Sequence, residues 1–113
     1  MTSDSNETTG TPSDLGMLIQ ALSNPVRLNI LRWLKEPLTH FPNQSYGQEL
    51  GVCMGQIVNR AGLSQSTVSR HMTLLQEVGL IDVFRTGSVH FFKRNEPSFL
   101  HLKAALKKEL QGS

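Results

Sequence analysis

Long apolar runs and cysteine pairs are missing from this sequence of 113 residues. No stretch approaches the roughly 20 consecutive apolar residues that a membrane-spanning helix needs. The polar N-terminus, residues 1–11, also lacks the apolar segment of a signal peptide. Cys53 is the single cysteine, so no intramolecular disulfide can form, as in proteins of a reducing compartment. These absences predict a cytoplasmic protein that makes no membrane contact.

The patterns of catalytic, cofactor and metal sites are absent too. The sequence has no Gly-x-Ser-x-Gly motif, no phosphate-binding glycine loop and no recognisable pair of catalytic carboxylates. A lone thiol is a poor zinc or arsenite site unless other ligands join it. We therefore expect no enzyme activity, no cofactor and no metal site. Cys53 is interpreted as a buried small apolar residue or, alternatively, as a redox-sensitive thiol.

Positive charge is concentrated in the part of the chain that is expected to fold. The net charge is only +2, but all eleven Lys and Arg lie at or beyond Arg27. Between Arg60 and Arg94 five basic residues stand against two acids, Glu77 and Asp82. This bias suits a polyanionic partner such as nucleic acid, although charge alone fits an ordinary solvated surface equally well.

Capping residues and hydrophobic periodicity predict a mainly α-helical domain over residues 13–111 with a small β-hairpin. Residues 1–12 are too poor in large apolar side chains to offset the entropy of ordering, so we expect a disordered tail. The expected elements are a helix signalled by Thr11–Asp14, a helix over 25–35, a long loop to residue 53 ending in a short strand, helices over 54–61 and 64–78, strands over 80–84 and 89–92 joined by a turn at 85–88, and a last helix from 95–97 onward.

The strongest functional signal is a helix, a glycine turn and a capped second helix between Ile57 and Met72. At about 100° per residue, the second helix places apolar side chains on one arc and hydroxyls, an amide and a guanidinium on the other. Such a polar arc can enter the major groove, where Gln and Arg offer paired donors to base edges. The hairpin that follows would supply a wing contact to the DNA backbone or minor groove. The predicted DNA-contacting residues are Ser64, Gln65, Ser66, Thr67, Ser69, Arg70 and Thr73, with Arg85 on the wing.

Three segments resemble the ArsR family of bacterial winged-helix repressors. They are residues 21–31, residues 62–72 and the hydrophobic wing with its Arg-x-Gly turn, within a likeness that runs from about Leu15 to Leu110. The resemblance implies a dimeric winged helix-turn-helix that leaves DNA when an effector binds. It also implies a dimer built from the first and last helices. The interface residues so implied are Leu15, Leu18, Leu22, Phe99, Leu102 and Leu106.

One departure from the family concerns metal sensing. Metal sensors of this kind often carry a Cys-x-Cys pair before the helix-turn-helix, whereas here Cys53 stands alone and Gly55 occupies the second position.

The predicted function is that of a sequence-specific DNA-binding regulator, acting as a repressor on an operator with an inverted repeat. The competing interpretation is a winged-helix module that binds protein or RNA, because a fold does not fix a function. Arg70 and its neighbouring hydroxyls favour DNA.

Overall fold

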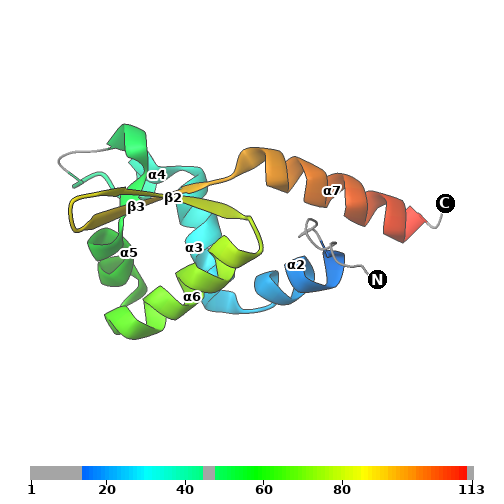
Figure 1. Ribbon diagram of the computed structural model, residues 1–113, viewed down its shortest axis with the longest axis horizontal. Coiled ribbons are helices and arrows are strands. Elements are labelled where there is room, and N and C mark those ends of the chain that lie inside the picture. The colour runs from blue at the N-terminus through cyan, green and yellow to red at the C-terminus, as the bar shows by residue number, and fades with distance from the viewer. Residues whose placement is uncertain (1–13, 45–47, 112–113) are drawn as a thin grey trace, which may run out of the picture.

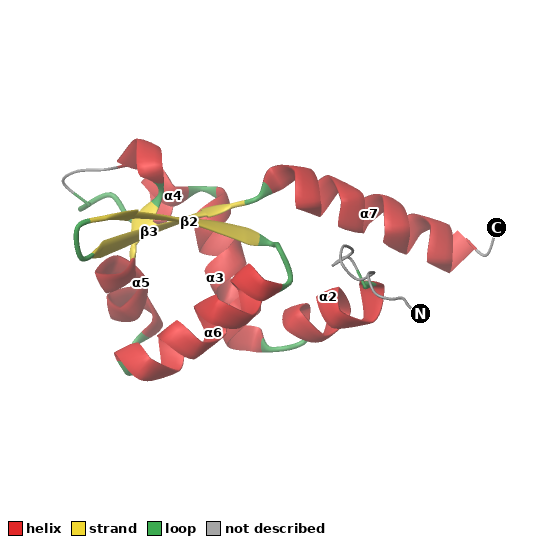
Figure 2. Ribbon diagram, in the orientation of Figure 1, coloured by secondary structure: helices red, strands yellow, loops and turns green. Residues whose placement is uncertain are grey.

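The computed structural model describes residues 14–44 and 48–111, in which helices surround a small antiparallel sheet (Figures 1 and 2). The mainly helical fold with a β-hairpin is therefore confirmed. The expected tail, residues 1–12, lies outside the described residues. The elements are α2 Leu15–Leu22, α3 Pro25–Lys35, α4 Pro37–His40, the 3₁₀ helix η3 Gln48–Leu50, β1 Val52–Cys53, α5 Met54–Ala61, α6 Gln65–Glu77, β2 Ile81–Thr86, β3 Val89–Arg94 and α7 Glu96–Gln111.

Side-chain caps fix where the helices begin. Asn24 accepts hydrogen bonds from the Val26 and Arg27 amides at 2.8 and 3.2 Å, with Pro25 at the first position of α3, as the sequence predicts. Helix α2 begins at Leu15, later than the Thr11–Asp14 signal predicts. The reason is that Asp14 is itself the cap, and its carboxylate accepts from the Gly16 amide at 2.9 Å.

The segment between α3 and β1 is more ordered than predicted. The sequence predicts a long loop directly after the helix over 25–35, which is wrong for residues 37–40. Pro37 instead starts the short helix α4, because proline at a first helical position loses no hydrogen bond. Phe41, 3% exposed, anchors the end of α4 in the core. The predicted short strand before residue 54 is confirmed as β1.

The sheet has three strands in the order β1-β3-β2, whereas the sequence predicted a two-stranded wing. The pair Val52–Cys53 lies opposite Phe92 and Phe91, a long-range pairing that no local pattern reveals. The wing strands also extend further than predicted, so the turn shrinks to Gly87 and Ser88. Gly87 has a φ of 60°, a conformation that suits a tight two-residue hairpin turn.

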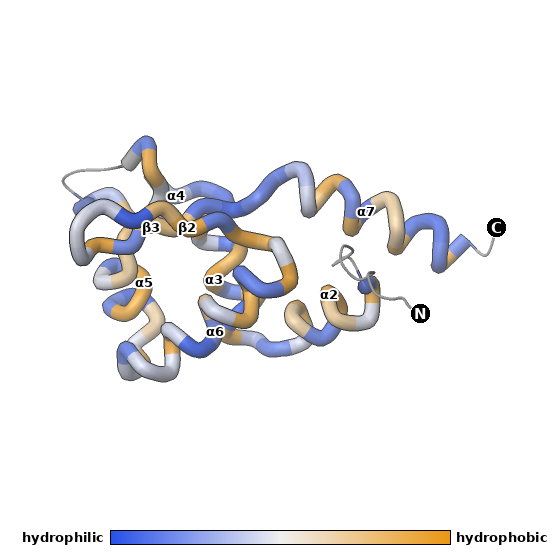
Figure 3. The backbone as a smooth tube through the Cα atoms, viewed as in Figure 1, coloured by the Kyte–Doolittle hydropathy of each residue, from blue (hydrophilic) through white to orange (hydrophobic). Residues whose placement is uncertain are grey.

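The core lies between α3, α5, α6 and the inner face of the sheet. Ile30, Ile57, Val68 and Leu75 are each fully buried there. Helix α7 projects away from the sheet and packs along α2, and Figure 3 shows apolar and polar residues alternating along it. Within residues 14–44 and 48–111, no helix is long and apolar enough to cross a membrane.

Candidate nucleic-acid interface

Helices α5 and α6 form a helix-turn-helix. Gly62 ends α5 with a φ of 68°, the left-handed conformation that glycine adopts without strain, and its amide donates to the Val58 carbonyl at 3.0 Å. Ile57 of α5 and Val68 of α6 are both 0% exposed. Their burial against the common core fixes the angle between the two helices and turns the opposite arc of α6 toward solvent.

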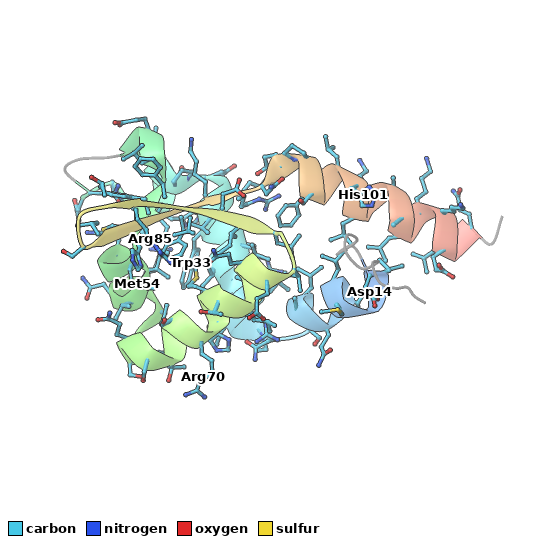
Figure 4. All side chains as sticks on the ribbon, in the orientation of Figure 1. Asp14, Trp33, Met54, Arg70, Arg85 and His101 are labelled. Atoms are coloured by element: carbon cyan, nitrogen blue, oxygen red, sulfur yellow. The ribbon has the colours of Figure 1, made fainter. Side chains whose placement is uncertain are left out.

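The solvent-facing arc of α6 is the polar arc that the sequence predicts. Gln65, Ser66, Arg70 and Thr73 are exposed, and Ser69 is half-buried. Arg70 points away from the body of the molecule (Figure 4). Among the described residues, neither Gln65 nor Arg70 has a hydrogen-bond or ion-pair partner that would hold its side chain against the protein. These polar groups are therefore free to bind base edges.

Two predicted contact residues have a local structural role. The Ser64 hydroxyl accepts from the Thr67 amide at 3.2 Å and donates to the Thr67 hydroxyl at 2.9 Å. This cap satisfies one of the free amides of the first turn and fixes the start of α6. The remaining first-turn amides and the positive end of the helix dipole give this end of α6 an affinity for phosphate.

The wing carries Arg85 on β2, exposed and opposite His90 in the register of the hairpin (Figure 4). His90 is half-buried with its ring edge-on to Phe92, at 6.5 Å between centroids. Phe84, beside Arg85, is 49% exposed, a feature that the sequence analysis did not single out. The wing therefore presents one cation and one aromatic ring at adjacent positions.

The basic stretch, residues 60–94, provides less free charge than its composition suggests. Arg94 forms a two-point ion pair with Glu96, at 2.9 and 3.2 Å. Arg60 lies over the ring of Trp33, at 5.0 Å from its centroid. Arg70 and Arg85 are thus the arginines of this stretch, among the described residues, whose charge is not engaged by a neighbouring side chain.

The predicted dimer residues of α2 and α7 lie in two different environments. Leu18 and Leu102 are only 4% and 5% exposed, because they pack inside the single chain. Leu15, Leu22, Phe99 and Leu106 are half-buried at the edge of the same core. Ile19 and Met17, which are not among the predicted interface residues, are 46% and 50% exposed. Leu110, the last member of the α7 stripe, is 82% exposed.

Cys53 stands immediately before α5 and is half-buried. Its amide donates to the buried side-chain carbonyl of Gln44 at 2.9 Å, and the Gln44 side-chain amide donates to the Gly51 carbonyl at the same distance. The thiol therefore lies next to a tightly bonded backbone segment that leads into the helix-turn-helix. In the described part of the chain, no three His, Cys, Asp or Glu side chains are grouped as a metal site would require.

His71 of α6 lies in surroundings that lower its pKa. Burial, and then the positive charges of Arg27 and Arg70, lower the pKa of His71 below its ordinary value of 6.5. The ring is half-buried, and its Nδ1 lies 3.1 Å from the Arg27 guanidinium.

Comparison with known proteins shows to which family the chain belongs. Residues 49–83, which span β1, the helix-turn-helix and the start of the wing, match the model of the bacterial regulatory protein arsR family. The HTH-type transcriptional regulator YbzH of Bacillus subtilis is 41% identical over 95 residues, covering 82% of this chain and 95% of YbzH. The chain belongs to the ArsR family. It is therefore a DNA-binding transcriptional regulator, and its relatives are regulators and not enzymes.

Solved structures share the fold of this ArsR-family regulator at lower identity. An ArsR-like transcriptional regulator from Rhodococcus sp. RHA1 has a TM-score of 0.65 at 19% identity, over 92% of this chain and 86% of that one. Mb0332 from Mycobacterium bovis, described as a homodimeric winged helix-turn-helix DNA-binding domain, has a TM-score of 0.60 at 19% identity, over 100% of this chain and 96% of that one. The winged helix-turn-helix predicted from the sequence is thereby confirmed.

Proposed function

We propose that this regulator is a repressor that binds an inverted-repeat operator as a homodimer and leaves it when an effector binds. The observation that carries the proposal is the solvent-facing arc of α6, where Gln65 and Arg70 have no partner among the described residues. Each α6 would lie in a major groove, with the Arg85 wing against the adjacent backbone. Because its ligand is DNA, the protein would work in the cytoplasm.

The apolar surface of α2 and α7 supports the homodimer. Leu15, Ile19 and Leu22 recur at helical spacing along one edge of α2, and each is at least partly exposed. A two-fold axis would bring this edge against its own copy or against the exposed end of α7. The homodimeric state of Mb0332, a protein of the same fold, supports the same arrangement.

Selection of bound DNA from a random pool tests the proposal. Two recognition helices related by a two-fold axis must enter successive major grooves on one side of the duplex. The selected sites should therefore be inverted repeats with half-site centres about 10 base pairs apart. A protein- or RNA-binding module would instead enrich no DNA sequence and would show little DNA retention even at low salt.

A change at the wing should weaken all DNA sequences alike. Arg85→Ala removes a cation that would contact phosphate and no group that reads a base. The slope of log affinity against log salt should fall by about one for each lost contact, so by about two for a dimer. Titrations of operator and scrambled duplexes at several salt concentrations measure this slope. A loss confined to the operator would show that Arg85 reads sequence.

The Cys53→Ser variant tests whether the thiol senses an oxidant. This variant should bind the operator like the wild type, because Cys53 lies before α5 and away from the solvent-facing arc of α6. If the effector is an oxidant, a peroxide should release the wild type from DNA and leave the variant bound. If the oxidant releases neither protein, redox sensing is excluded as the effector mode. Loss of binding by a folded variant would contradict the placement of Cys53.

A further inference from the structure

We propose that Arg27 positions the recognition helix, by joining the C-terminal end of α2 to His71 of α6. This inference rests on the proposed function, because it concerns how the dimer helix α2 and the DNA-reading helix α6 keep their relative placement. It assigns to Arg27 and His71 a part in operator binding without any contact to DNA.

The guanidinium of Arg27 makes contacts in two directions. Its Nε donates to the Ala21 carbonyl at 2.7 Å, and one terminal nitrogen lies 3.3 Å from the Gln20 carbonyl. Both carbonyls belong to the last turn of α2, where the helix dipole is negative, and the Gln20 carbonyl also accepts from the Ser23 amide at 3.2 Å and from the Ser23 hydroxyl at 2.8 Å. The other terminal nitrogen lies 3.1 Å from Nδ1 of His71. One planar side chain on α3 therefore holds the end of α2 and the middle of α6 together.

The contact with His71 requires a neutral ring. Arginine has donors and no acceptor, so Nδ1 must carry a lone pair and the ring proton must lie on Nε2. The cations that act on the ring are Arg27 from α3 and Arg70 from α6 itself, while α2 contributes the Gln20 and Ala21 carbonyls that hold Arg27. Protonation of Nδ1 would turn it into a second donor that faces the Arg27 donor at 3.1 Å. It would also bring the positive charges of His71 and Arg27 together.

The direction of the pH effect follows from the lowered pKa of His71. The folded protein binds this proton more weakly than the unfolded chain, whose histidine titrates near 6.5. The stabilising contribution is therefore complete above about pH 6.5 and is lost as the pH falls through the lower, folded value. Burial is the largest cause of the shift, and the charges of Arg27 and then Arg70 add to it.

The consequence for DNA recognition comes from the place of His71 in α6. It directly follows Arg70 in the chain and shares its helical turn, so a shift or rotation of α6 at His71 moves Arg70 as well. In a dimer held through α2, the same link sets the separation of the two recognition helices. Since both helices must meet half-sites one helical turn apart, a loosened link lowers operator affinity more than nonspecific affinity.

Three full-length variants and a pH series test this role. His71→Gln keeps an acceptor for Arg27 and cannot titrate, His71→Phe removes the acceptor, and Arg27→Lys keeps the charge but loses the planar fork. At about pH 7.5, where His71 is neutral, His71→Gln should bind the selected operator within about threefold of the wild type. His71→Phe and Arg27→Lys should bind it about tenfold or more weakly, as expected for an interaction of roughly 1.4 kcal/mol. Sedimentation and circular dichroism should show folded dimers throughout.

The pH series separates positioning from mere structural support. Between about pH 7.5 and 5 the wild type should lose more operator affinity than His71→Gln, because only the wild type carries the titrating ring at this place. NMR of ¹⁵N-labelled wild type should report the Nε2-protonated tautomer at the upper pH. Superimposable pH profiles, or full operator affinity in Arg27→Lys, would overturn the inference. A wild type that selects no DNA would instead overturn the proposed function.

Discussion

Arg70→Ala should bind the preferred operator about 5- to 150-fold more weakly than the wild type, a loss of ~1–3 kcal/mol. Arg70 is exposed, points away from the body of the protein and has no partner among the described residues, so its removal leaves the folded chain intact. The guanidinium offers two parallel donors, which match the two acceptors on the major-groove edge of guanine. Sequence preference should therefore relax at one position of each half-site, while nonspecific binding falls much less.

Arg32→Ala is the matched control for Arg70→Ala. Arg32 is an exposed arginine on α3 whose one hydrogen-bond partner among the described residues is Asn29 on its own helix, at 3.3 Å. Its removal changes the net charge equally but leaves α6 untouched, so operator affinity should stay close to that of the wild type. Fluorescence anisotropy on operator and scrambled duplexes measures the operator affinity and the nonspecific affinity of each variant. Equal losses in the two variants, or unchanged specificity in Arg70→Ala, would remove α6 from the reading of sequence.

Ile19→Glu should convert the dimer to monomer at micromolar concentration and abolish tight operator binding. Ile19 is 46% exposed in the single chain, so a glutamate there can remain solvated in the monomer. In a symmetric interface the substitution occurs twice, and each copy would bury a carboxylate in an apolar contact. Loss of a central contact costs about 2 kcal/mol or more, so the dissociation constant of the dimer should rise by about 30-fold or more for each of the two lost contacts. Sedimentation equilibrium measures the dissociation constant of the dimer.

Two variants separate dimerisation from folding. Gln20→Glu adds the same charge at an exposed neighbouring position on α2, about 100° away from Ile19, and should remain dimeric. Leu102→Glu places a charge at a predicted interface residue that is only 5% exposed within one chain. It should therefore lower the free energy of unfolding and not simply release monomers. A dimeric Ile19→Glu protein would exclude this edge of α2 from the interface.

Local rules explain what could be predicted from the sequence. Asn24 and Ser64 cap helices through side-chain bonds within three residues, and Gly62 ends α5 in a conformation that suits glycine, so these boundaries can be inferred from short motifs. The polar arc of α6 follows from helical periodicity alone. These signals are sufficient to predict the helix-turn-helix and its solvent-facing residues.

The missed features depend on contacts between distant parts of the chain. Periodicity shows that α2 and α7 are amphipathic, but not whether a leucine faces its own core, as Leu18 and Leu102 do, or remains exposed, as Leu110 does. The pairing of β1 with β3 and the contact between Arg27 and His71, 44 residues apart, have no local signature. Such relations are set by tertiary packing, which single-sequence patterns do not encode.

Methylation protection of the selected operator tests the central claim most directly, because dimethyl sulfate attacks guanine at N7 in the major groove and adenine at N3 in the minor groove. With wild-type protein, guanine N7 should be protected in two patches whose centres lie about 10 base pairs apart on one side of the duplex. Arg70→Ala should restore methylation at one guanine in each patch. Protection confined to adenine N3, or a single patch without a symmetry mate, would contradict a dimer that reads DNA through α6.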